Sequence, residues 1–180
     1  MESRGSKDDW GLRRLRGNLI LVCAALASLC SLWPLQATAG DVAVSFVRPE
    51  HYTDIGFGQI ARQRNLKTLS EHMSEWGAAL PASQRLEIQV LDVDLAGLER
   101  PVGREPFLRV LSGQADWPRM SLQWSLRDGQ TLVASGKDRL SDMAYAHRLA
   151  LGDRNRPLYY ELRMLDEWLR TRIVKPDGSK

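Results

Sequence analysis

One uncharged run near the N-terminus, residues 19–33, decides how much of this chain can take part in a folded domain. The run has 15 residues, whereas a helix needs about 20 to cross the core of a bilayer. The apolar part of a secretory signal needs only about 7–15 residues, followed by small residues at the cleavage point. Ala37 and Ala39 supply those small residues. We therefore predict a cleavable signal peptide over residues 1–39, cut between Ala39 and Gly40.

Three other uses of this segment are open. An uncleaved run would anchor the chain in the membrane, but the run is short and the cleavage point is good. Arg13 and Arg14 could address the twin-arginine route, yet residues 15–17 lack the apolar pair typical of that route. Cys30 could carry a lipid, yet Leu29 stands where a small residue is wanted. We carry forward the general secretory route, which leaves a domain outside the cytoplasm without stable membrane insertion.

Cleavage would leave residues 40–180, a usual length for one domain and enough to bury a hydrophobic core. This part holds 20 basic and 19 acidic side chains, so that its net charge is +1. A nucleic-acid partner would want a strong basic excess, and we expect none. Both cysteines, Cys23 and Cys30, fall in the signal, which excludes a disulfide, a thiolate metal site and a cysteine nucleophile from the domain.

Two stretches have the apolar spacing of three and four residues that marks one face of a helix. The first stripe consists of Leu66, Leu69, Met73, Trp76 and Leu80. His72 lies beside it, and we expect this histidine at the surface. Pro157 opens the second helix, because a proline in the first turn loses no hydrogen bond. The second stripe consists of Leu158, Leu162, Leu165, Leu169 and Ile173.

Two strands are predicted in the first half of the domain. Residues 42–46 alternate between apolar and polar or small side chains, as a half-buried strand does. In residues 86–95 the apolar positions change from even to odd numbers at Val90-Leu91. A regular strand would then turn its apolar side to water, and a β-bulge at this point restores the phase. The bulge places Asp92 and Asp94 on the polar face.

A hairpin is predicted in the second half. Residues 120–126 alternate cleanly, and Asp128-Gly129 is a turn signal. A three-residue loop, 127–129, with Gly129 left-handed, keeps the even positions of the return strand buried. Those positions are Leu132, Ala134 and Gly136, a more apolar set than the Thr131, Val133 and Ser135 that a two-residue loop would bury. Residues 96–106 are predicted as a loop, and residues 107–110 as a short edge strand.

The element order β-α-β-(β)-β-β-α has one crossover helix followed by a meander. This order predicts an α+β fold in which an antiparallel-rich sheet of four to five strands has two helices packed on one face. The other face would be polar and solvated, because Ser121, Gln123 and Ser125 point to it. We expect a single domain over residues 40–174 and a frayed tail over residues 175–180.

Several short blocks, in order along the chain, have a family resemblance. The first are Val44-Ser45-Phe46-Val47 with Tyr52-Thr53-Asp54, and Leu91-Asp92-Val93-Asp94-Leu95-Ala96-Gly97. The next are Arg109-Val110-Leu111, Ala115-Asp116-Trp117-Pro118-Arg119 and Leu140-Ser141-Asp142-Met143. The last are Tyr160-Glu161 and Met164-Leu165-Asp166-Glu167-Trp168. Together they resemble a bacterial family known as domain of unknown function 3016, over residues 44–170.

The resemblance implies a signal-bearing, periplasmic protein of Gram-negative bacteria. It brings no activity, cofactor or catalytic residue that could be carried over. One position departs from the expected pattern, because this chain has Ala144 where an asparagine would precede the tyrosine that follows Met143. Any role of that asparagine is absent here.

Four acidic residues are candidates for a site. Asp92 and Asp94 lie two apart on one strand, so that their carboxylates point the same way about 7 Å apart. With Asp116 or Asp142 nearby, they could hold a divalent cation or divide into an acid and a base. The alternative is a solvated polar face with ordinary pairing to arginine. For Asp142 the alternative is the cap of a short helix, or a turn, that begins at Ser141.

Trp117 and Arg119 could form an interaction hot spot, because these residue types dominate such sites. The alternative is that Pro118 holds Trp117 extended at the start of a strand, with its ring on the sheet edge. No catalytic residue, metal site or cofactor is predicted. The three histidines lack metal-ligand spacing, and motifs for a serine nucleophile or a phosphate loop are absent.

Two functional hypotheses follow. The first is a non-catalytic binding module of the cell envelope, which contacts an unknown envelope protein or component through its polar sheet face or the edge around Trp117. The second is a hydrolase, or a metal-binding or ligand-binding enzyme, that uses Asp92, Asp94 and Asp116. The export signal and the lack of a recognisable nucleophile or cofactor loop favour the first.

Overall fold

The computed structural model describes residues 39–102, 105–147 and 156–175. The predicted signal peptide up to Thr38 and the predicted tail beyond Lys175 lie outside these residues. The described residues belong to one compact unit, and every member of the hydrophobic core lies within it. This part of the chain therefore carries a core of its own.

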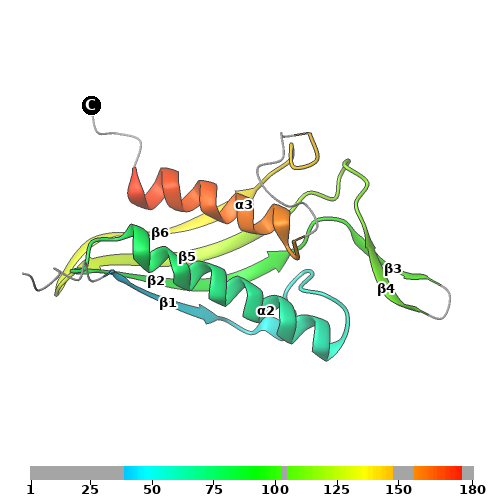
Figure 1. Ribbon diagram of the computed structural model, residues 1–180, viewed down its shortest axis with the longest axis horizontal. Coiled ribbons are helices and arrows are strands. Elements are labelled where there is room, and N and C mark those ends of the chain that lie inside the picture. The colour runs from blue at the N-terminus through cyan, green and yellow to red at the C-terminus, as the bar shows by residue number, and fades with distance from the viewer. Residues whose placement is uncertain (1–38, 103–104, 148–155, 176–180) are drawn as a thin grey trace, which may run out of the picture. The chain divides into compact units, whose positions relative to one another are not determined.

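Four strands form one mixed sheet. They are β1 (Asp41–Phe46), β2 (Gln84–Asp94), β5 (Arg119–Asp128) and β6 (Thr131–Ser141), in the order β1-β2-β5-β6. β1 runs parallel to β2, because a helix crosses over between them, and the other two pairs are antiparallel. The structure confirms the predicted α+β fold with an antiparallel-rich sheet (Figure 1).

Both predicted helices lie on the same side of this sheet (Figure 1). After a 3-10 turn, η2 (Pro49–His51), comes α2 (Gly58–Ser74), which continues as the 3-10 helix η3 (Glu75–Ala79). The last helix is α3 (Tyr159–Trp168), which continues as the π-helical turn η4 (Leu169–Val174). Among the described residues, no helix has the length and apolar character needed to span a membrane.

The predicted start of the second helix is wrong. α3 begins at Tyr159, two residues after Pro157. Leu158 has left-handed backbone, with φ of 57°, and it therefore cannot belong to the helix. Pro157 lies in the turn that precedes it.

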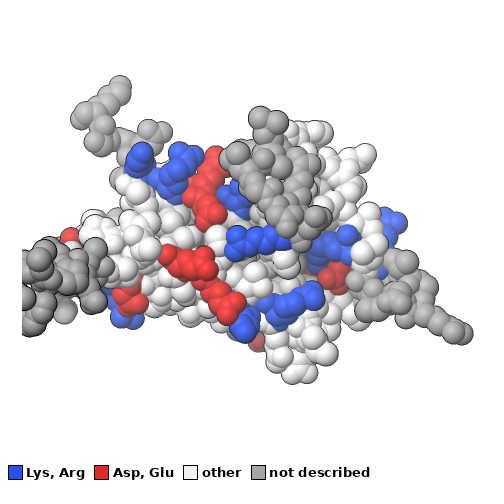
Figure 2. Space-filling view, in the orientation of Figure 1, with Lys and Arg blue, Asp and Glu red and all other residues white. Residues whose placement is uncertain are grey.

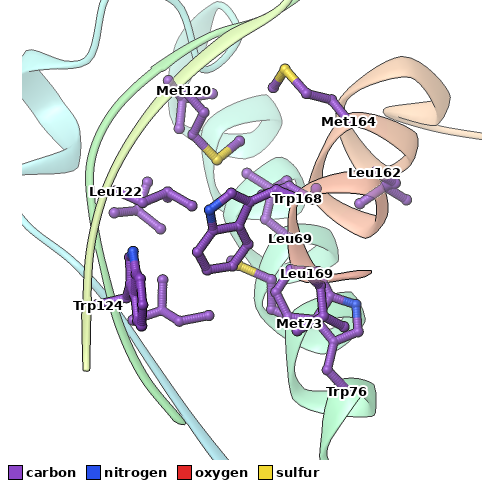
Figure 3. Close-up of a cluster of buried hydrophobic side chains, with 14 of the residues drawn as sticks. Leu69, Met73, Trp76, Met120, Leu122, Trp124, Leu162, Met164, Trp168 and Leu169 are labelled. Atoms are coloured by element: carbon purple, nitrogen blue, oxygen red, sulfur yellow. The ribbon is translucent and has the colours of Figure 1, made fainter. Parts of the chain in front are cut away.

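The hydrophobic core lies between the sheet and the two helices (Figure 3). The sheet contributes Leu86, Ile88, Val90, Leu122, Trp124 and Leu126, and the helices contribute Leu69, Met73, Trp76, Leu162, Leu165 and Trp168. The indole N–H groups of Trp124 and Trp168 both donate to Oδ2 of Asp138, at 2.8 and 2.9 Å. The helix-facing side of β6 thus satisfies the two polar atoms that these rings bring into the core.

His72 is buried, at 8% exposure, so that the expectation of a surface residue is wrong. Its Nε2 lies 2.7 Å from Oδ1 of Asp166 on α3, and the same oxygen accepts from the indole N–H of Trp76 at 3.0 Å. Arg156 lies 3.5 Å from the other ring nitrogen. The histidine lies between α2 and α3 because these partners satisfy its ring there.

The predicted β-bulge in β2 is confirmed. The register shifts between Val90 and Asp92, so that Leu91 is the extra residue. Beyond it, Val93 returns to the core, whereas Asp92 and Asp94 lie on the side of the sheet opposite to the helices. We call that side the open face.

The turn between β5 and β6 differs from the prediction. Its loop has two residues, Gly129 and Gln130, although Gly129 is left-handed as expected, with φ of 55°. Val133 is then an extra residue in β6 that shifts the register. This second bulge returns Ala134 to the predicted buried side and leaves Leu132 51% exposed.

The prediction of a loop over residues 96–106 is also wrong. β3 (Leu98–Val102) lies within it and pairs antiparallel with β4 (Glu105–Val110) in a separate two-stranded sheet. The predicted edge strand, 107–110, is therefore longer and does not join the main sheet. Figure 1 shows this hairpin extending beyond the end of the four-stranded sheet. Glycines and prolines favoured a loop, but cross-strand pairing between β3 and β4 decides the structure.

Candidate functional site

Five of the six candidate residues line two adjoining hollows at one end of the sheet. The first hollow, of about 330 Å³, is lined by Asp94, Asp116, Trp117 and Arg119, with Leu98 and residues of the loop before β5. The second, of about 450 Å³, is lined by Asp92, Asp94, Arg119, Thr53, Ser121, Arg139 and Ser141. Asp94 and Arg119 line both. We call these two hollows together the β2 end.

An ion pair separates the two hollows. Nη1 of Arg119 donates to Oδ2 of Asp94 at 2.7 Å, because the two residues stand opposite each other on β5 and β2. The guanidinium also lies 4.6 Å from the centre of the Trp117 ring. Arg119 is thus held between a carboxylate and an aromatic face, a contact that remains attractive at a partly exposed position.

Asp92 anchors the loop that follows β1. The backbone N–H and the hydroxyl of Thr53 donate to its two oxygens, at 2.8 and 2.9 Å. The next residue, Asp54, extends this contact along the backbone, donating to Val93 and accepting from Leu95. The bulge in β2 makes these contacts possible, since it turns Asp92 away from the core.

Asp116 closes the loop before β5. Its carboxylate accepts from the backbone N–H groups of Ser112 and Gln114 and, at 2.8 Å, from the hydroxyl of Tyr145. Burial raises the pKa of Asp116, but the hydrogen bonds outweigh burial and lower it to about 2. Burial, followed by the nearby Asp116, raises the pKa of Tyr145 to about 12. At neutral pH the pair is therefore a carboxylate and a neutral phenol.

Asp142 lines neither hollow. It is 5% exposed, and its Oδ2 accepts from Nη2 of Arg163 on α3 at 2.7 Å. Its carbonyl accepts from the backbone N–H of Tyr145, at 3.1 Å, in the turn predicted after Ser141. Asp142 thus joins the end of β6 to α3.

The sequence reasoning missed a second polar cluster, which fastens the β3–β4 hairpin to the β2 end. Arg109 donates to both oxygens of Asp54, at 2.9 and 3.2 Å, and to Glu99 at 3.1 Å. It also donates to the carbonyls of Ala96 and Gly97. Burial lowers the pKa of Arg109, but the carboxylates of Asp54 and Glu99 outweigh burial and raise it.

Glu161 extends this cluster into the first turn of α3. It is 3% exposed, and its Oε1 accepts from the backbone N–H of Ala96 at 2.7 Å. Burial raises its pKa. The sequence held one signal for this residue, because Glu161 lies three residues after Leu158 and four before Leu165, on the apolar stripe. A hollow of about 300 Å³, lined also by Tyr159 and other residues, lies beside it.

A family model matches most of the chain. It is described as Protein of unknown function (DUF3016), and the match covers residues 40–171. The chain belongs to the DUF3016 family. The resemblance found in the sequence blocks is thereby confirmed. Among curated proteins and among solved structures, nothing matches.

Several of the blocks that resemble the DUF3016 family meet at or beside the β2 end. Side-chain contacts join one block to another: Thr53 to Asp92, Arg109 to Asp54, and Glu161 to Ala96. These blocks are thus joined by polar side-chain contacts. Only some of their residues belong to the hydrophobic core.

The candidate acids of this DUF3016 domain are held by donors of their own chain, as described above for Asp92, Asp94 and Asp116. In the part of the chain that the structure describes, no group of three or more histidines, cysteines or acids could hold a metal ion. An ionised Asp116 with a pKa of about 2 is also a weak base. Among the described residues, each of these three carboxylates therefore already accepts hydrogen bonds from its own chain.

Proposed function

We propose that this protein is exported through its N-terminal signal, cut between Ala39 and Gly40, and acts in the periplasm as a non-catalytic binding module of the cell envelope. The β2 end is its binding surface. The pair of adjoining hollows around Trp117 and Arg119 carries the proposal, because it offers an aromatic ring and a guanidinium side by side. These are the residue types most enriched at energetically important contacts.

The charges of the open face support this choice. Lys137 and Arg139 lie on the open face of β6, opposite Gln123 and Ser121 of β5. None of these four side chains has a hydrogen bond or an ion pair within the described residues. They offer donors to a partner that carries carboxylate, phosphate or hydroxyl groups. Acidic and basic side chains are interspersed on the face that carries the helices (Figure 2).

Site-specific photo-crosslinking in cells that express the full chain tests the proposal. A photoreactive residue replaces Ala115, which lines the first hollow, or, as a control, Lys67, which is 74% exposed on α2. We expect one defined envelope component to be labelled from position 115 and not from position 67. The additional substitutions Trp117→Ala and Arg119→Ala should each weaken the labelling at least fivefold. N-terminal sequencing of the same protein should begin at Gly40.

Two results would contradict the two parts of the proposal separately. Protein that still begins at Met1 and is recovered from the cytosol rules out export. Labelling that is equal from positions 115 and 67, or that both alanine substitutions leave unchanged, rules out the β2 end as the binding surface.

A further inference from the structure

β1 is an edge strand of the four-stranded sheet, and its outer side has no strand partner among the described residues. The backbone N–H of Val47 donates to the carbonyl of Val90 at 2.9 Å. Because the direction of bonding alternates along a strand, Val42, Val44 and Phe46 turn their backbone groups away from β2. Such an edge can pair with another strand.

The other edge strands carry features that natural sheets use against such pairing. β6, at the opposite edge, has the charged run 137–139 and a bulge at Val133. β3 and β4 contain Pro101 and Pro106, respectively. β1 carries a charge only at its first residue, Asp41. Residues 42–47 contain no charge and no proline, and the β1–β2 pairing is regular.

We propose that this edge pairs with β1 of a second copy of the chain, antiparallel, about a two-fold axis at Val44. In this register Val44 meets Val44 of the copy, Val42 meets Phe46, and Ala43 meets Ser45. Apolar side chains then face apolar ones, and small side chains face small ones. A two-fold interface that uses the same patch on both copies is the commonest homodimer. This inference goes beyond the proposed function, and neither depends on the other.

Burial and charge both favour a second copy as the occupant. Val42, Val44 and Phe46 pack against the core but remain partly exposed, and a neighbouring β1 would cover them. The nearest charge, Asp41, lies at the end of the strand and pairs with Arg85 at 2.8 Å. No like charges therefore face each other across the axis.

The outward side of the β3–β4 hairpin is a competing surface. Leu98, Leu108 and Val110 are exposed there, at 58%, 57% and 41%. Strand pairing at β1 draws on main-chain hydrogen bonds as well as on area, and we therefore prefer it.

Sedimentation velocity of residues 40–180, which contain the whole core, tests the pairing. We expect a concentration-dependent dimer. Ala43→Lys with Ser45→Lys places like charges opposite each other across the axis, and it should raise the dissociation constant at least tenfold. Ala43→Lys with Ser45→Glu places opposite charges there and should keep the dimer. Ser135→Lys, on the outer strand β6, is the control and should change nothing.

Disulfide formation tests the register. Residues 40–180 contain no cysteine, so that introduced thiols have no competitors. A mixture of Ala43→Cys and Ser45→Cys proteins should form a mixed disulfide. In the proposed register these two residues form a non-hydrogen-bonded pair, whose side chains lie within disulfide reach. Each protein alone should form far less. A monomer at all concentrations, a dimer unaffected by the double lysine variant, or a dimer abolished by Leu108→Ser would overturn the inference.

Discussion

Asp116 shows how one carboxylate fixes a loop between two distant segments. It accepts from backbone groups of its own loop and from the hydroxyl of Tyr145, which lies in the turn after β6. These bonds favour the ionised form, and they lower the pKa from 3.8 to about 2. A carboxyl group whose pKa is lower in the folded state stabilises the fold above its unfolded pKa, and this stabilisation is lost as the pH falls through the folded pKa.

Asp116→Asn should remove this pH-dependent contribution. In the natural chain it is about 1–2 kcal/mol after allowance for solvent screening, complete above about pH 4 and lost by about pH 2. The variant should be less stable at pH 7, and its stability should fall less between pH 4 and pH 2. Urea unfolding across this range measures both effects, with the exposed Asp128→Asn as control. A variant with the acid sensitivity of the natural chain would contradict the assignment.

At the level of residues, the sequence could indicate neighbours but not distant partners. Trp117 and Arg119 lie together because they are close in the chain. Arg109 and Glu161 were not predicted, since Arg109 lies 55 positions from Asp54 and Glu161 lies 65 from Ala96. Only the fold brings such groups together.

The β3–β4 hairpin reverses the usual arrangement of an amphipathic element. Glu99 and Arg109 face the body of the domain, whereas Leu98 and Leu108 are exposed on the outward side. Polar contacts therefore hold this hairpin in place. Arg109 pairs with both Asp54 and Glu99, and its removal would leave two partly buried carboxylates without their shared cation.

Arg109→Met should loosen the hairpin without unfolding the sheet. The methionine keeps part of the side-chain volume but removes every hydrogen bond to Asp54 and Glu99. Hydrogen exchange should become at least tenfold faster across residues 98–110 and change little across residues 86–90 of β2. Arg100→Met, on the outward side, is the matched control. Unchanged exchange in the hairpin would show that these ion pairs do not hold it.

At the level of elements, the spacing of apolar residues within one segment predicted features of that segment alone. The change of phase at Val90-Leu91 required the β2 bulge, because no regular strand could bury both halves. β3 was missed because its pairing with β4 contradicts the glycines and prolines around it. The predicted length of the β5–β6 loop was wrong. A two-residue loop followed by a bulge at Val133 buries Ala134 just as a three-residue loop without a bulge would.

The part of the chain that the structure describes is a two-layer domain whose helices cover one side of a mixed sheet. Both helical stripes and the element order predicted this arrangement, because apolar faces of helix and sheet can be buried only against each other. Leu69 shows how complete the burial is, since its exposure is 0%. The strand order follows from contacts between distant segments, and the sequence alone did not provide it.

Leu69→Ala should destabilise the whole domain. Loss of a fully buried leucine side chain costs about 2–5 kcal/mol, the range depending on how far the surroundings relax. Urea unfolding should show one cooperative transition at a lower midpoint. Ile60→Ala, 84% exposed on the same helix, should change stability by less than about 0.5 kcal/mol. Equal effects of the two substitutions would contradict the described core.

The carboxylate of Asp138 holds two tryptophans that can serve as an intrinsic fluorescence probe. Its one oxygen receives an indole from the sheet, Trp124, and an indole from the last helix, Trp168. If that helix lifted away, water would reach both rings together and their emission would move to longer wavelengths. The attachment of the C-terminal layer can thus be followed by intrinsic fluorescence, with no dye attached to the chain.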